Sequence, residues 1–304
     1  MSMRFKTRKG PDGLHVFSRS SGLNILFDEI SVPSADWSTA PRQVSVALTN
    51  ACDLRCSYCY APKKRARLEY DQLTGWLSEL DNTGCFGVGF GGGEPTLHRD
   101  FARLCRFASK YTDLAVTFTT HAHRINERLA CQLEGNVHFI RVSVDGFGST
   151  YETLRGRPFH QLLQSLEFIR ALAPFGVNFV VNAATFPDID AVLALAIQYG
   201  ASEFLLLPEQ ATPQCDGIDG ETRQRLSEWV STPHPDILLT VSKNDTVGFP
   251  TCDPLEQEKY LRSYAHIDAS GFIKRSSYDN AGVRIGIGGV SQALKDLQRM
   301  SGVI

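Results

Sequence analysis

Short apolar runs alternate with helical patterns between residues 43 and 208, and this alternation restricts the chain to few folds. Buried strands are expected at 44–48, 86–90, 114–119, 137–144, 177–184 and 204–207. Helical spacing of apolar residues lies between them, at 69–80, 97–111, 125–133, 159–175 and 189–199. This order predicts an α/β fold with a parallel sheet and right-handed crossovers. Six strand–helix units suit an open doubly wound sheet or an incomplete barrel, and in both a ligand binds at the carboxyl ends of the strands.

Two flanking regions have a different pattern. Within residues 1–42, apolar runs at 15–19 and 23–27 flank a turn and predict a β-hairpin. Residues 209–304 read as a small α+β extension with a second hairpin near 264–274 and a closing helix at 290–300. We therefore expect three parts, 1–42, 43–208 and 209–304.

Charge and hydropathy exclude several protein classes. The formal charge of the 304 residues is −2, which argues against a nucleic-acid binder that relies on bulk positive charge. No apolar run reaches transmembrane length. The basic N-terminus is not followed by the apolar stretch of a signal peptide. We expect a cytoplasmic protein without a membrane partner.

Three of the eight cysteines, Cys52, Cys56 and Cys59, fall within eight residues, directly after the first expected strand. In a reducing compartment, such clustering indicates metal ligands or catalytic groups. A structural zinc site needs a fourth ligand and is usually built from two paired ligand sets, and no second Cys/His pair with that spacing is present. An iron–sulfur cluster held by three cysteines would leave one iron open, and we favour it over zinc.

The second expected strand ends in Gly91-Gly92-Gly93-Glu94-Pro95. Three glycines permit close approach of a ligand to the backbone, and Pro95 can open the next helix. Glu94 then places a carboxylate at the strand ends. Alone, such a run is typical of an ordinary strand–helix turn, but here it lies on the strand that follows the cysteine motif.

Together, Cys-x3-Cys-x2-Cys after the first strand and Gly-Gly-Glu-Pro after the second resemble the radical S-adenosylmethionine (SAM) superfamily, over about residues 43–208. The resemblance implies a partial (β/α)6 TIM-like barrel. It implies one [4Fe–4S] cluster held by Cys52, Cys56 and Cys59, and SAM bound to the open iron through its amino and carboxylate groups. Members of this superfamily cleave SAM to a 5′-deoxyadenosyl radical, which abstracts a hydrogen atom from the substrate.

The resemblance also implies residues that contact SAM. Gly92, Gly93 and Glu94 would receive the methionine amino group. Ser143, in the run Val-Ser-Val-Asp-Gly, would contact the ribose or the carboxylate, and Arg155 would pair with the carboxylate. Further implied contacts come from Tyr58, whose backbone would border the adenine, from Thr120, and from Asn182 and Leu206 on the fifth and sixth strands.

Two features depart from the superfamily pattern. The third strand usually ends Thr-Asn-Gly, whereas this chain has Thr120-His121-Ala122; His121 reads either as a hydrogen-bonded loop histidine or as a proton donor near the substrate. The hairpin near 265–274 resembles the SPASM/twitch extension of peptide-modifying members. Because the extension contains only Cys215 and Cys252, and a cluster bound by thiolates alone needs four, we expect no auxiliary cluster.

Cys215 and Cys252 have a second interpretation. Both lie in loops after the last expected strand, where a thiol could return a hydrogen atom to a substrate radical. The alternative is an ordinary structural thiol, which is our interpretation of Cys85, Cys105 and Cys131.

Three functions remain open at this stage. The first is modification of a ribosomally made peptide, because of the SPASM-like hairpin and of the N-terminal hairpin, which could offer a strand edge to a peptide. The second is a radical enzyme that acts on a small molecule, such as a sugar, nucleoside or aminoglycoside-type compound, for example as an epimerase. The third is a non-catalytic iron–sulfur regulatory protein. The basic run 63–67 reads as a solvated face or as a docking patch for an acidic electron donor such as flavodoxin.

Overall fold

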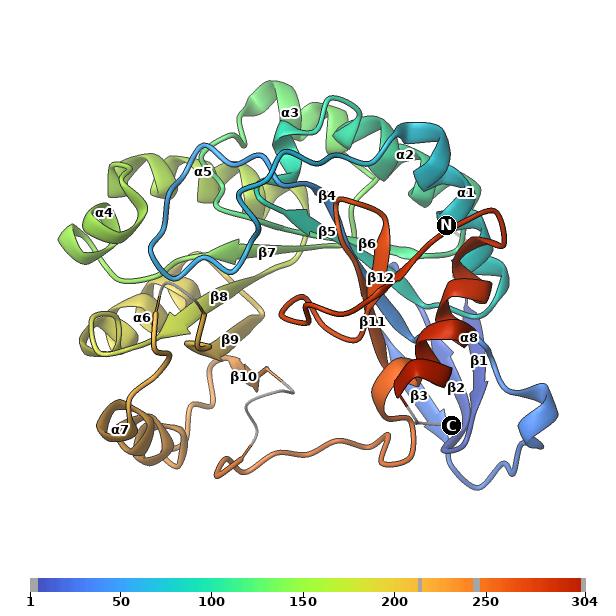
Figure 1. Ribbon diagram of the computed structural model, residues 1–304. Helices are drawn as coiled ribbons and strands as arrows, with labels where there is room; N and C mark the ends of the chain where they lie inside the picture. Colours follow the sequence, from blue (N-terminus) through green and yellow to red (C-terminus); the bar gives the residue numbers. More distant parts are fainter. Residues whose placement is uncertain (1–4, 213–214, 243–246, 302–304) are drawn as a thin grey trace.

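A curved sheet, covered by helices on one face, forms the body of the protein (Figure 1). The computed structural model describes residues 5–212, 215–242 and 247–301. In these residues, a ten-stranded sheet has the order β10-β9-β8-β7-β6-β5-β4-β11-β12-β13. Its strands are β4 (Gln43–Thr49), β5 (Gly87–Gly92), β6 (Ala115–Thr120), β7 (Phe139–Ser143), β8 (Phe175–Val181), β9 (Glu203–Pro208), β10 (Leu238–Val241), β11 (Tyr264–Ile267), β12 (Phe272–Lys274) and β13 (Val283–Arg284).

Neighbouring strands from β10 through β4 to β11 are parallel, and β12 and β13 continue the sheet antiparallel. The helices are α1 (Tyr70–Asn82), α2 (Phe101–Tyr111), α3 (Glu127–Leu133), α4 (Ser149–Arg155), α5 (Phe159–Leu172), α6 (Ile189–Gln198), α7 (Gly220–Val230) and α8 (Gly289–Ser301). None of the described helices is both long and apolar enough to cross a membrane.

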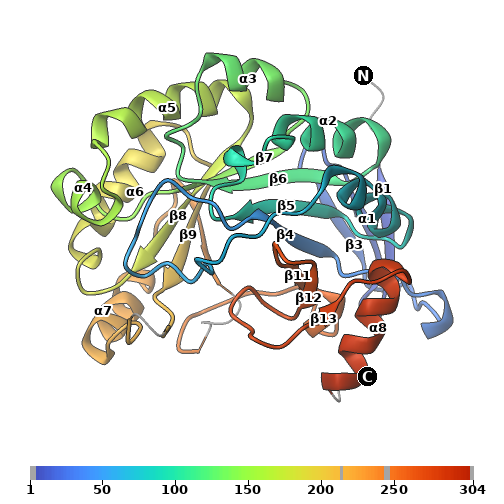
Figure 2. The same cartoon turned by 45° about the horizontal axis from the view of Figure 1, so that its top comes forward.

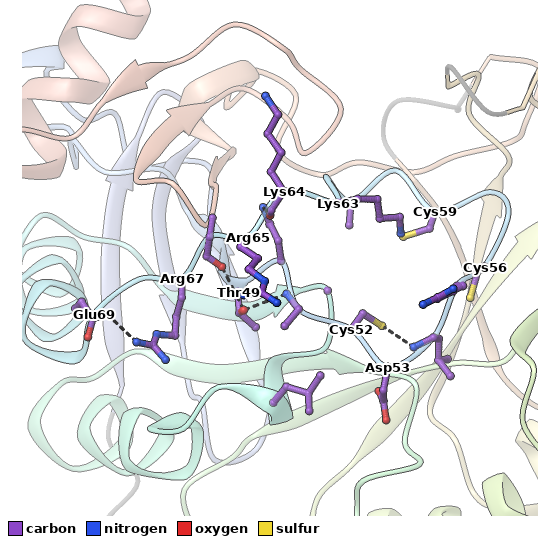
Figure 3. A pocket seen from close by; sticks show the side chains of 18 residues that line it. Thr49, Cys52, Asp53, Cys56, Cys59, Lys63, Lys64, Arg65, Arg67 and Glu69 are labelled. Carbon is purple, nitrogen blue, oxygen red and sulfur yellow. Dashed lines mark hydrogen bonds and ion pairs between the residues drawn. The ribbon is translucent and has the colours of Figure 1, made fainter.

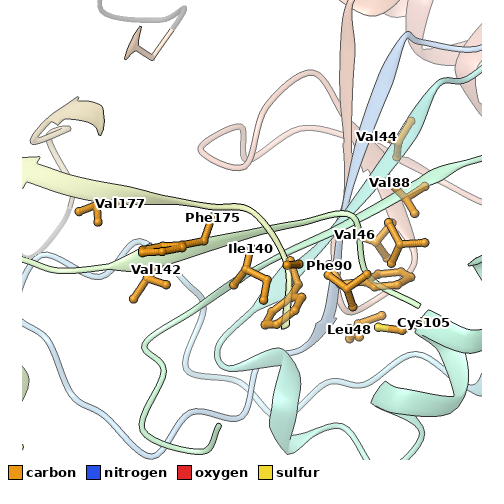
Figure 4. Close-up of a cluster of buried hydrophobic side chains, with 14 of the residues drawn as sticks. Val44, Val46, Leu48, Val88, Phe90, Cys105, Ile140, Val142, Phe175 and Val177 are labelled. Atoms are coloured by element: carbon orange, nitrogen blue, oxygen red, sulfur yellow. The ribbon is translucent and has the colours of Figure 1, made fainter. Parts of the chain in front are cut away.

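The main core lies between the sheet and the helices. Alternate strand residues such as Val44, Val46 and Leu48 of β4 and Val88 and Phe90 of β5 are fully buried there (Figure 4). Side chains of a strand alternate between the two faces, so the residues between them line the concave face. Helices α1 to α6 all follow the outer, convex face (Figures 1 and 2). A doubly wound sheet would carry helices on both faces, so the partial barrel expected from the sequence is confirmed.

The C-terminal region joins the sheet at both of its edges. β10 pairs in parallel with β9, and β11 pairs in parallel with β4. The hairpin expected near 264–274 is confirmed as β11 and β12, with His266 opposite Lys274. Its resemblance to a SPASM/twitch module stays a prediction. The sequence did not predict β10, whose four residues have too little pattern to be told from a loop, nor the continuation of the barrel sheet by β10 and β11.

The N-terminal region forms a separate three-stranded sheet, in the order β1 (Lys6–Gly10), β2 (Gly13–Phe17) and β3 (Asn24–Phe27). The hairpin expected from the sequence corresponds to β2 and β3. β1 was missed because its sequence, Lys-Thr-Arg-Lys-Gly, is charged. Tertiary contacts hold it: Arg8 is buried and donates from Nε to Oε1 of Glu258 at 2.5 Å.

Two expected helix boundaries were wrong, and proline explains both. The helix expected to continue to residue 175 ends at Leu172, because Pro174 restricts the residue before it to extended backbone. Gly176 is consequently a residue of β8 and not a helix terminator. The helix expected from residue 97 starts at Phe101, since Pro95–Leu97 form a separate 3-10 turn directly after Glu94.

Candidate active site at the carboxyl ends of the strands

The three clustered cysteines lie on a loop that leaves the carboxyl end of β4 and returns beside it. Asn50 N–H donates to the Ala66 carbonyl at 3.0 Å, and Leu68 N–H donates to the Leu48 carbonyl at 3.0 Å. Between these closures the chain surrounds a cavity of about 1070 Å³ (Figure 3). Cys52, Cys56 and Cys59 line this cavity, and each is a half-buried free thiol. We call residues 52–59 the cysteine loop.

The geometry of these thiols argues against one zinc ion. Zinc–thiolate bonds of about 2.3 Å require ligand atoms within about 4.6 Å of one another. In the part of the chain that the structure describes, the candidate metal ligands that lie within 4.8 Å of one another are Cys52, Asp53 and His121. Cys56 and Cys59 do not belong to this group. The three cysteines are therefore too dispersed for a single ion, whereas a cubane cluster binds its thiolates at separate irons.

The glycines before Glu94 permit the close approach of two chain segments. A Cβ on Gly92, whose φ is +125°, would lie 2.2 Å from the Thr49 carbonyl oxygen, and a Cβ on Gly93 would lie 2.2 Å from that of Ala51. The sequence interpretation had assigned this close approach to a ligand. At Gly92 and Gly93 the partner is instead the chain itself, and only Gly91 faces open space, with no atom within 4 Å of the added Cβ. Hydrogen bonds from Gly93 and Glu94 to Thr49 and Ala51 join the segments.

Glu94 is held in one orientation by neighbouring donors. Its side chain is only 1% exposed. Oε1 accepts hydrogen bonds from the Thr96 hydroxyl at 2.7 Å, the Thr96 N–H at 3.2 Å and the Thr120 hydroxyl at 2.8 Å. Oε2 accepts from the His121 N–H at 3.1 Å. Oε2 therefore has fewer partners and is the oxygen better able to accept a ligand ammonium group. The Thr120 hydroxyl therefore donates to Glu94, whereas the resemblance implied a contact between Thr120 and SAM.

Asp145 is a second buried carboxylate, and it ties the cysteine loop to the barrel. Its side chain is fully buried. The Tyr58 hydroxyl donates to Oδ2 at 2.6 Å, Arg155 forms an ion pair with the same oxygen, and the Val180 N–H donates to Oδ1 at 2.8 Å. Tyr58, expected to border an adenine through its backbone, thus has a structural contact through its side chain.

Arg155 faces the cysteine loop as well as Asp145. Its Nη1 lies 3.6 Å from Sγ of Cys56, and its Nε is buried without a hydrogen-bond partner. Burial alone would lower the pKa of Arg155, but the charge of Asp145 outweighs burial and raises it. A permanent cation with an unpaired buried donor beside a thiol is suited to an anionic ligand such as a carboxylate.

The donor set fits an iron–sulfur cluster and a zwitterionic ligand. Burial raises the pKa of the Cys52 thiol, and a bound metal reverses such an effect because it stabilises the thiolate. Three free thiols supply three ligands, Glu94 Oε2 offers an acceptor for an ammonium group, and Arg155 Nε offers a donor for a carboxylate. These residues therefore fit the two groups that the sequence resemblance implies.

The other expected SAM contacts differ in their placement. Ser143 ends β7 in register with Asn178, half-buried on the concave face. Oδ1 of the Asn182 side chain accepts hydrogen bonds from the N–H groups of Ala184 and Thr185, so this amide stabilises its own turn. Leu206 is 2% exposed in the core between sheet and helices. That face is opposite to the site, so its side chain does not support the expected adenine contact.

Cys215 and Cys252 lie at different ends of the barrel. Cys215 follows β9 near its carboxyl end, is half-buried, and lies 3.4 Å from the Gln210 carbonyl. Cys252 is exposed and adjoins Asp253, whose charge acts on Arg42 just before the start of β4. The cysteine loop is at the other end of β4. Neither thiol belongs to the compact ligand group found in the described residues, and the absence of an auxiliary cluster stays a prediction.

Sequence reasoning missed two residues of the site, Asp53 and Asp145. Asp145 lies two residues after Ser143 in the run that carried the resemblance, and its position at a strand end could have indicated a buried acid. Asp53 adjoins Cys52, and its Oδ1 lies 2.8 Å from Nε2 of His121. Burial alone would raise the pKa of Asp53, but the hydrogen bond from His121 and the charge of Arg124 lower it overall.

Comparison with known proteins decides the family. Residues 46–192 match the sequence profile described as the Radical SAM superfamily. This segment is a Radical SAM domain. Radical SAM proteins use a [4Fe–4S] cluster and SAM, the two groups that the donor set fits. The matched segment begins in β4 and ends in α6, so it contains the cysteine loop, Glu94, Ser143 and Arg155.

Several radical SAM proteins resemble the chain beyond the profile. The mycofactocin maturase MftC of Mycolicibacterium smegmatis is 29% identical over 207 residues, which cover 63% of this chain and 52% of MftC. The AdoMet-dependent heme synthase of Methanosarcina barkeri is 26% identical over 202 residues, which cover 62% of this chain and 58% of that protein. The chain spans about half the length of the curated relatives it matches.

A solved radical SAM structure shares the fold. SuiB of Streptococcus suis bound to SAM superimposes with a TM-score of 0.72 at 13% identity, covering 91% of this chain and 83% of SuiB. SuiB bound to its precursor peptide SuiA gives a TM-score of 0.71 at 13% identity, with 92% and 84% covered. At this identity the likeness concerns the fold, and it confirms the partial barrel.

Proposed function

We propose that the chain is a radical SAM enzyme that modifies a ribosomally made peptide. One observation carries the enzymatic part: three free cysteines, the buried Glu94 and Arg155, whose side chain is 9% exposed, meet at the carboxyl ends of parallel strands. An iron–sulfur protein that only regulates or transfers electrons needs the cysteines but not the two charged groups. Their presence therefore supports SAM-dependent catalysis over a non-catalytic role.

Each residue has a role in this proposal. When bound, the cluster and SAM supply hydrogen-atom abstraction from an unactivated carbon by a 5′-deoxyadenosyl radical. Cys52, Cys56 and Cys59 hold the cluster. Glu94 accepts from the ammonium group of SAM, Arg155 donates to its carboxylate, and Ser143 lies where the ribose or carboxylate is expected. The barrel wall excludes water and holds one C–H bond of the substrate in place.

The relatives and the N-terminal sheet support a peptide substrate. MftC is named a maturase, and SuiB has been solved with a precursor peptide. In this chain, β3 is an edge strand of the N-terminal sheet, and Leu23, Ile25 and Phe27 next to and within it are 38–44% exposed. An extended peptide can add to such an edge through backbone hydrogen bonds.

A small-molecule substrate is the second candidate. It rests on the likeness to a heme synthase, which matches nearly the same share of the chain as MftC. A tetrapyrrole therefore joins the sugars and nucleosides that the sequence left open.

Cys215 is the better placed of the two thiols proposed as hydrogen-atom donors. It lies after β9, at the same end of the sheet as the cysteine loop, whereas Cys252 lies toward the opposite end. If Cys215 donates the hydrogen atom, the substrate carbon is altered without net oxidation, for example by inversion of a stereocentre, and the thiyl radical left on Cys215 takes one electron from the electron donor and one proton from water. Product made in deuterated water would then contain one deuterium at that carbon.

The basic run after the cysteine loop supports an acidic electron donor as a partner. Lys63, Lys64 and Arg65 are exposed, form no ion pair with the described residues, and line the same cavity as the cysteines (Figure 3). Such a patch attracts an acidic protein such as flavodoxin to the place where an electron must enter.

Anaerobic reconstitution tests the enzyme proposal. We expect about four irons per chain, and none after replacement of Cys52, Cys56 and Cys59 by alanine. Glu94→Gln should keep the irons but weaken SAM binding more than tenfold, because it removes the charge of a buried partner. Iron retained by the triple variant would show that other residues hold the cluster.

Substrate incubation then separates the candidates. The reduced protein is given SAM and either precursor peptides or tetrapyrroles in deuterated water, and mass spectrometry follows 5′-deoxyadenosine and substrate mass. A mass change in peptide only supports the proposal, and one in tetrapyrrole only supports the second candidate. Full cluster loading without any 5′-deoxyadenosine would favour the regulatory protein. Normal product from Cys215→Ala would remove the thiol from the mechanism.

A further inference from the structure

The side chain of His121 connects two segments that the proposed function treats separately. It is 4% exposed. Its Nε2 lies 2.8 Å from Oδ1 of Asp53, in the cysteine loop, and 3.4 Å from Oε2 of Glu94. Among the described residues, no other side chain contacts both carboxylates, so His121 forms a bridge between the cluster segment and the expected SAM amino-group site.

The contact made by the other ring nitrogen, Nδ1, indicates which nitrogen of His121 carries the proton. The His123 N–H points to Nδ1 of His121 at 3.2 Å, while also approaching the His121 carbonyl at 3.0 Å. An N–H donor beside Nδ1 requires a lone pair on that nitrogen, so the ring proton is on Nε2. The Nε2–H therefore points toward the two carboxylates and donates to Asp53, the closer one.

Asp53 also contacts two arginines on other segments of the barrel. Arg124, after β6, lies 3.7 Å from Oδ2, and Arg157, between α4 and α5, lies 3.3 Å from the same oxygen. Both guanidinium groups reach Oδ2, which leaves Oδ1 to His121. Because Asp53 directly follows Cys52, the placement of its carboxylate constrains the first cluster ligand.

We propose that His121 is a positioning residue, whose Nε2–H couples Asp53 of the cysteine loop to Glu94 and so fixes the cluster segment relative to the SAM amino-group site. The inference rests on the proposed function for the role of Glu94. It assigns a purpose to the residue at which this chain departs from the Thr-Asn-Gly pattern of the superfamily. Of the two sequence interpretations of His121, it develops the hydrogen-bonded loop histidine and replaces the proton donor to the substrate, since the ring faces the chain's own carboxylates and its donor is already engaged.

The required property is a donor at the position of Nε2, and two substitutions isolate it. His121→Gln keeps an N–H donor of similar reach, whereas His121→Leu keeps the bulk and removes the donor. Asp53→Ala removes the acceptor on the cysteine loop. His138→Leu is the matched control, because His138 is another partly buried histidine, bonded to the Val116 N–H at 3.0 Å and placed between β6 and β7 at their amino ends.

The first readout needs no SAM. Anaerobically reconstituted proteins are treated with an iron chelator, and loss of the cluster absorbance is timed. We expect His121→Leu and Asp53→Ala to lose the cluster about tenfold faster than wild type, as for removal of a hydrogen bond to a charged group. His121→Gln and His138→Leu should stay within threefold of wild type. Equal rates in all five proteins would overturn the coupling to the cysteine loop.

The second readout is the affinity for SAM, measured from the change in the electron paramagnetic resonance spectrum of the reduced cluster. We expect about tenfold weaker binding in His121→Leu and binding within threefold of wild type in His121→Gln. Equal weakening in both variants would overturn the inference, because the donor would then not be the property that matters. A wild-type protein that holds its cluster but binds no SAM would instead contradict the proposed function, while the chelator rates still decide the bridge.

Discussion

Two aspartates hold the cysteine loop to the barrel, and their environments differ. Asp145, after β7, is fully buried and bonded to Tyr58 of the loop, to Arg155 and to a backbone N–H. Asp53 belongs to the loop itself, is 27% exposed at its side chain, and contacts His121, Arg124 and Arg157. The buried carboxylate has lost its hydration and depends on its partners, whereas water still solvates the other. We therefore expect Asp145 to govern folding and Asp53 to govern the site.

The largest effect is expected for Asp145→Asn. The change leaves Arg155 as a buried cation without its counter-ion, which costs about 3–5 kcal/mol in the free energy of unfolding. Urea unfolding under anaerobic conditions, followed by tryptophan fluorescence, measures it. Replacing both residues, as in Asp145→Asn with Arg155→Gln, should restore part of the loss because no unpaired charge remains. A loss below about 1 kcal/mol in the single variant would remove the distinction between the two aspartates.

Tyr58→Phe tests the same contact between the cysteine loop and Asp145, by changing the residue on the loop. It deletes one hydrogen bond to a charged acceptor, so the free energy of unfolding should fall by about 1.5–3 kcal/mol. Tyr111→Phe is a suitable control because that side chain is 76% exposed, and it should stay within about 0.5 kcal/mol of wild type. If the two phenylalanine variants unfold alike, the Tyr58 hydroxyl does not anchor the loop.

Asp53→Ala should have a small effect on folding. Its ion pairs are partly exposed and screened, so about 1 kcal/mol or less of unfolding free energy is expected to be lost. The same variant should lose its cluster about tenfold faster, as argued for His121. Urea unfolding and chelator kinetics on one preparation give both numbers. A stability loss as large as that of Asp145→Asn would mean that both anchors serve the fold.

The smallest effect is a pH dependence of the difference between wild type and Asp53→Ala. The pKa of Asp53 is lowered from its ordinary value of 3.8 in the folded protein, so its contribution is complete above about pH 3.8 and is lost as the pH falls through the folded value. Unfolding midpoints of the two proteins should therefore differ equally at pH 7 and pH 5 and converge below pH 4. Convergence already at pH 5 would contradict this assignment.

Both proteins should also share a loss of stability as the pH falls from 6.5 to about 4, a range above the one in which Asp53 titrates. Burial lowers the pKa of His138 and of His266 to about 4. These residues favour the folded state while they are neutral, so their contribution is complete above pH 6.5 and declines as the pH falls from 6.5 to about 4. This decline is common to wild type and Asp53→Ala and leaves their difference unchanged.

Local patterns in the sequence determined the parallel α/β arrangement and the identity of the central site residues, whereas the partial barrel was implied by the resemblance to the superfamily. Strand and helix periodicity arises from neighbouring residues, so it predicted the order of β4 to β9 and of α1, α2, α3, α5 and α6 between them. It missed the short helix α4 and extended the strand of β8 beyond Val181. The spacing of Cys52, Cys56 and Cys59 and the run ending in Glu94 are likewise contiguous features. They were sufficient to indicate the superfamily and both of its cofactors.

Only the tertiary structure decided how these parts are held together. Tyr58 and Asp145 are 87 residues apart, and Asp53 and His121 are 68 apart, so no local period links them. The same holds for β10 and β11, which extend the barrel sheet because their backbone groups find partners on β9 and β4. A sequence states which side chains are available for such contacts, but closure of the sheet brings them within hydrogen-bond distance, and burial then sets the strength of each contact.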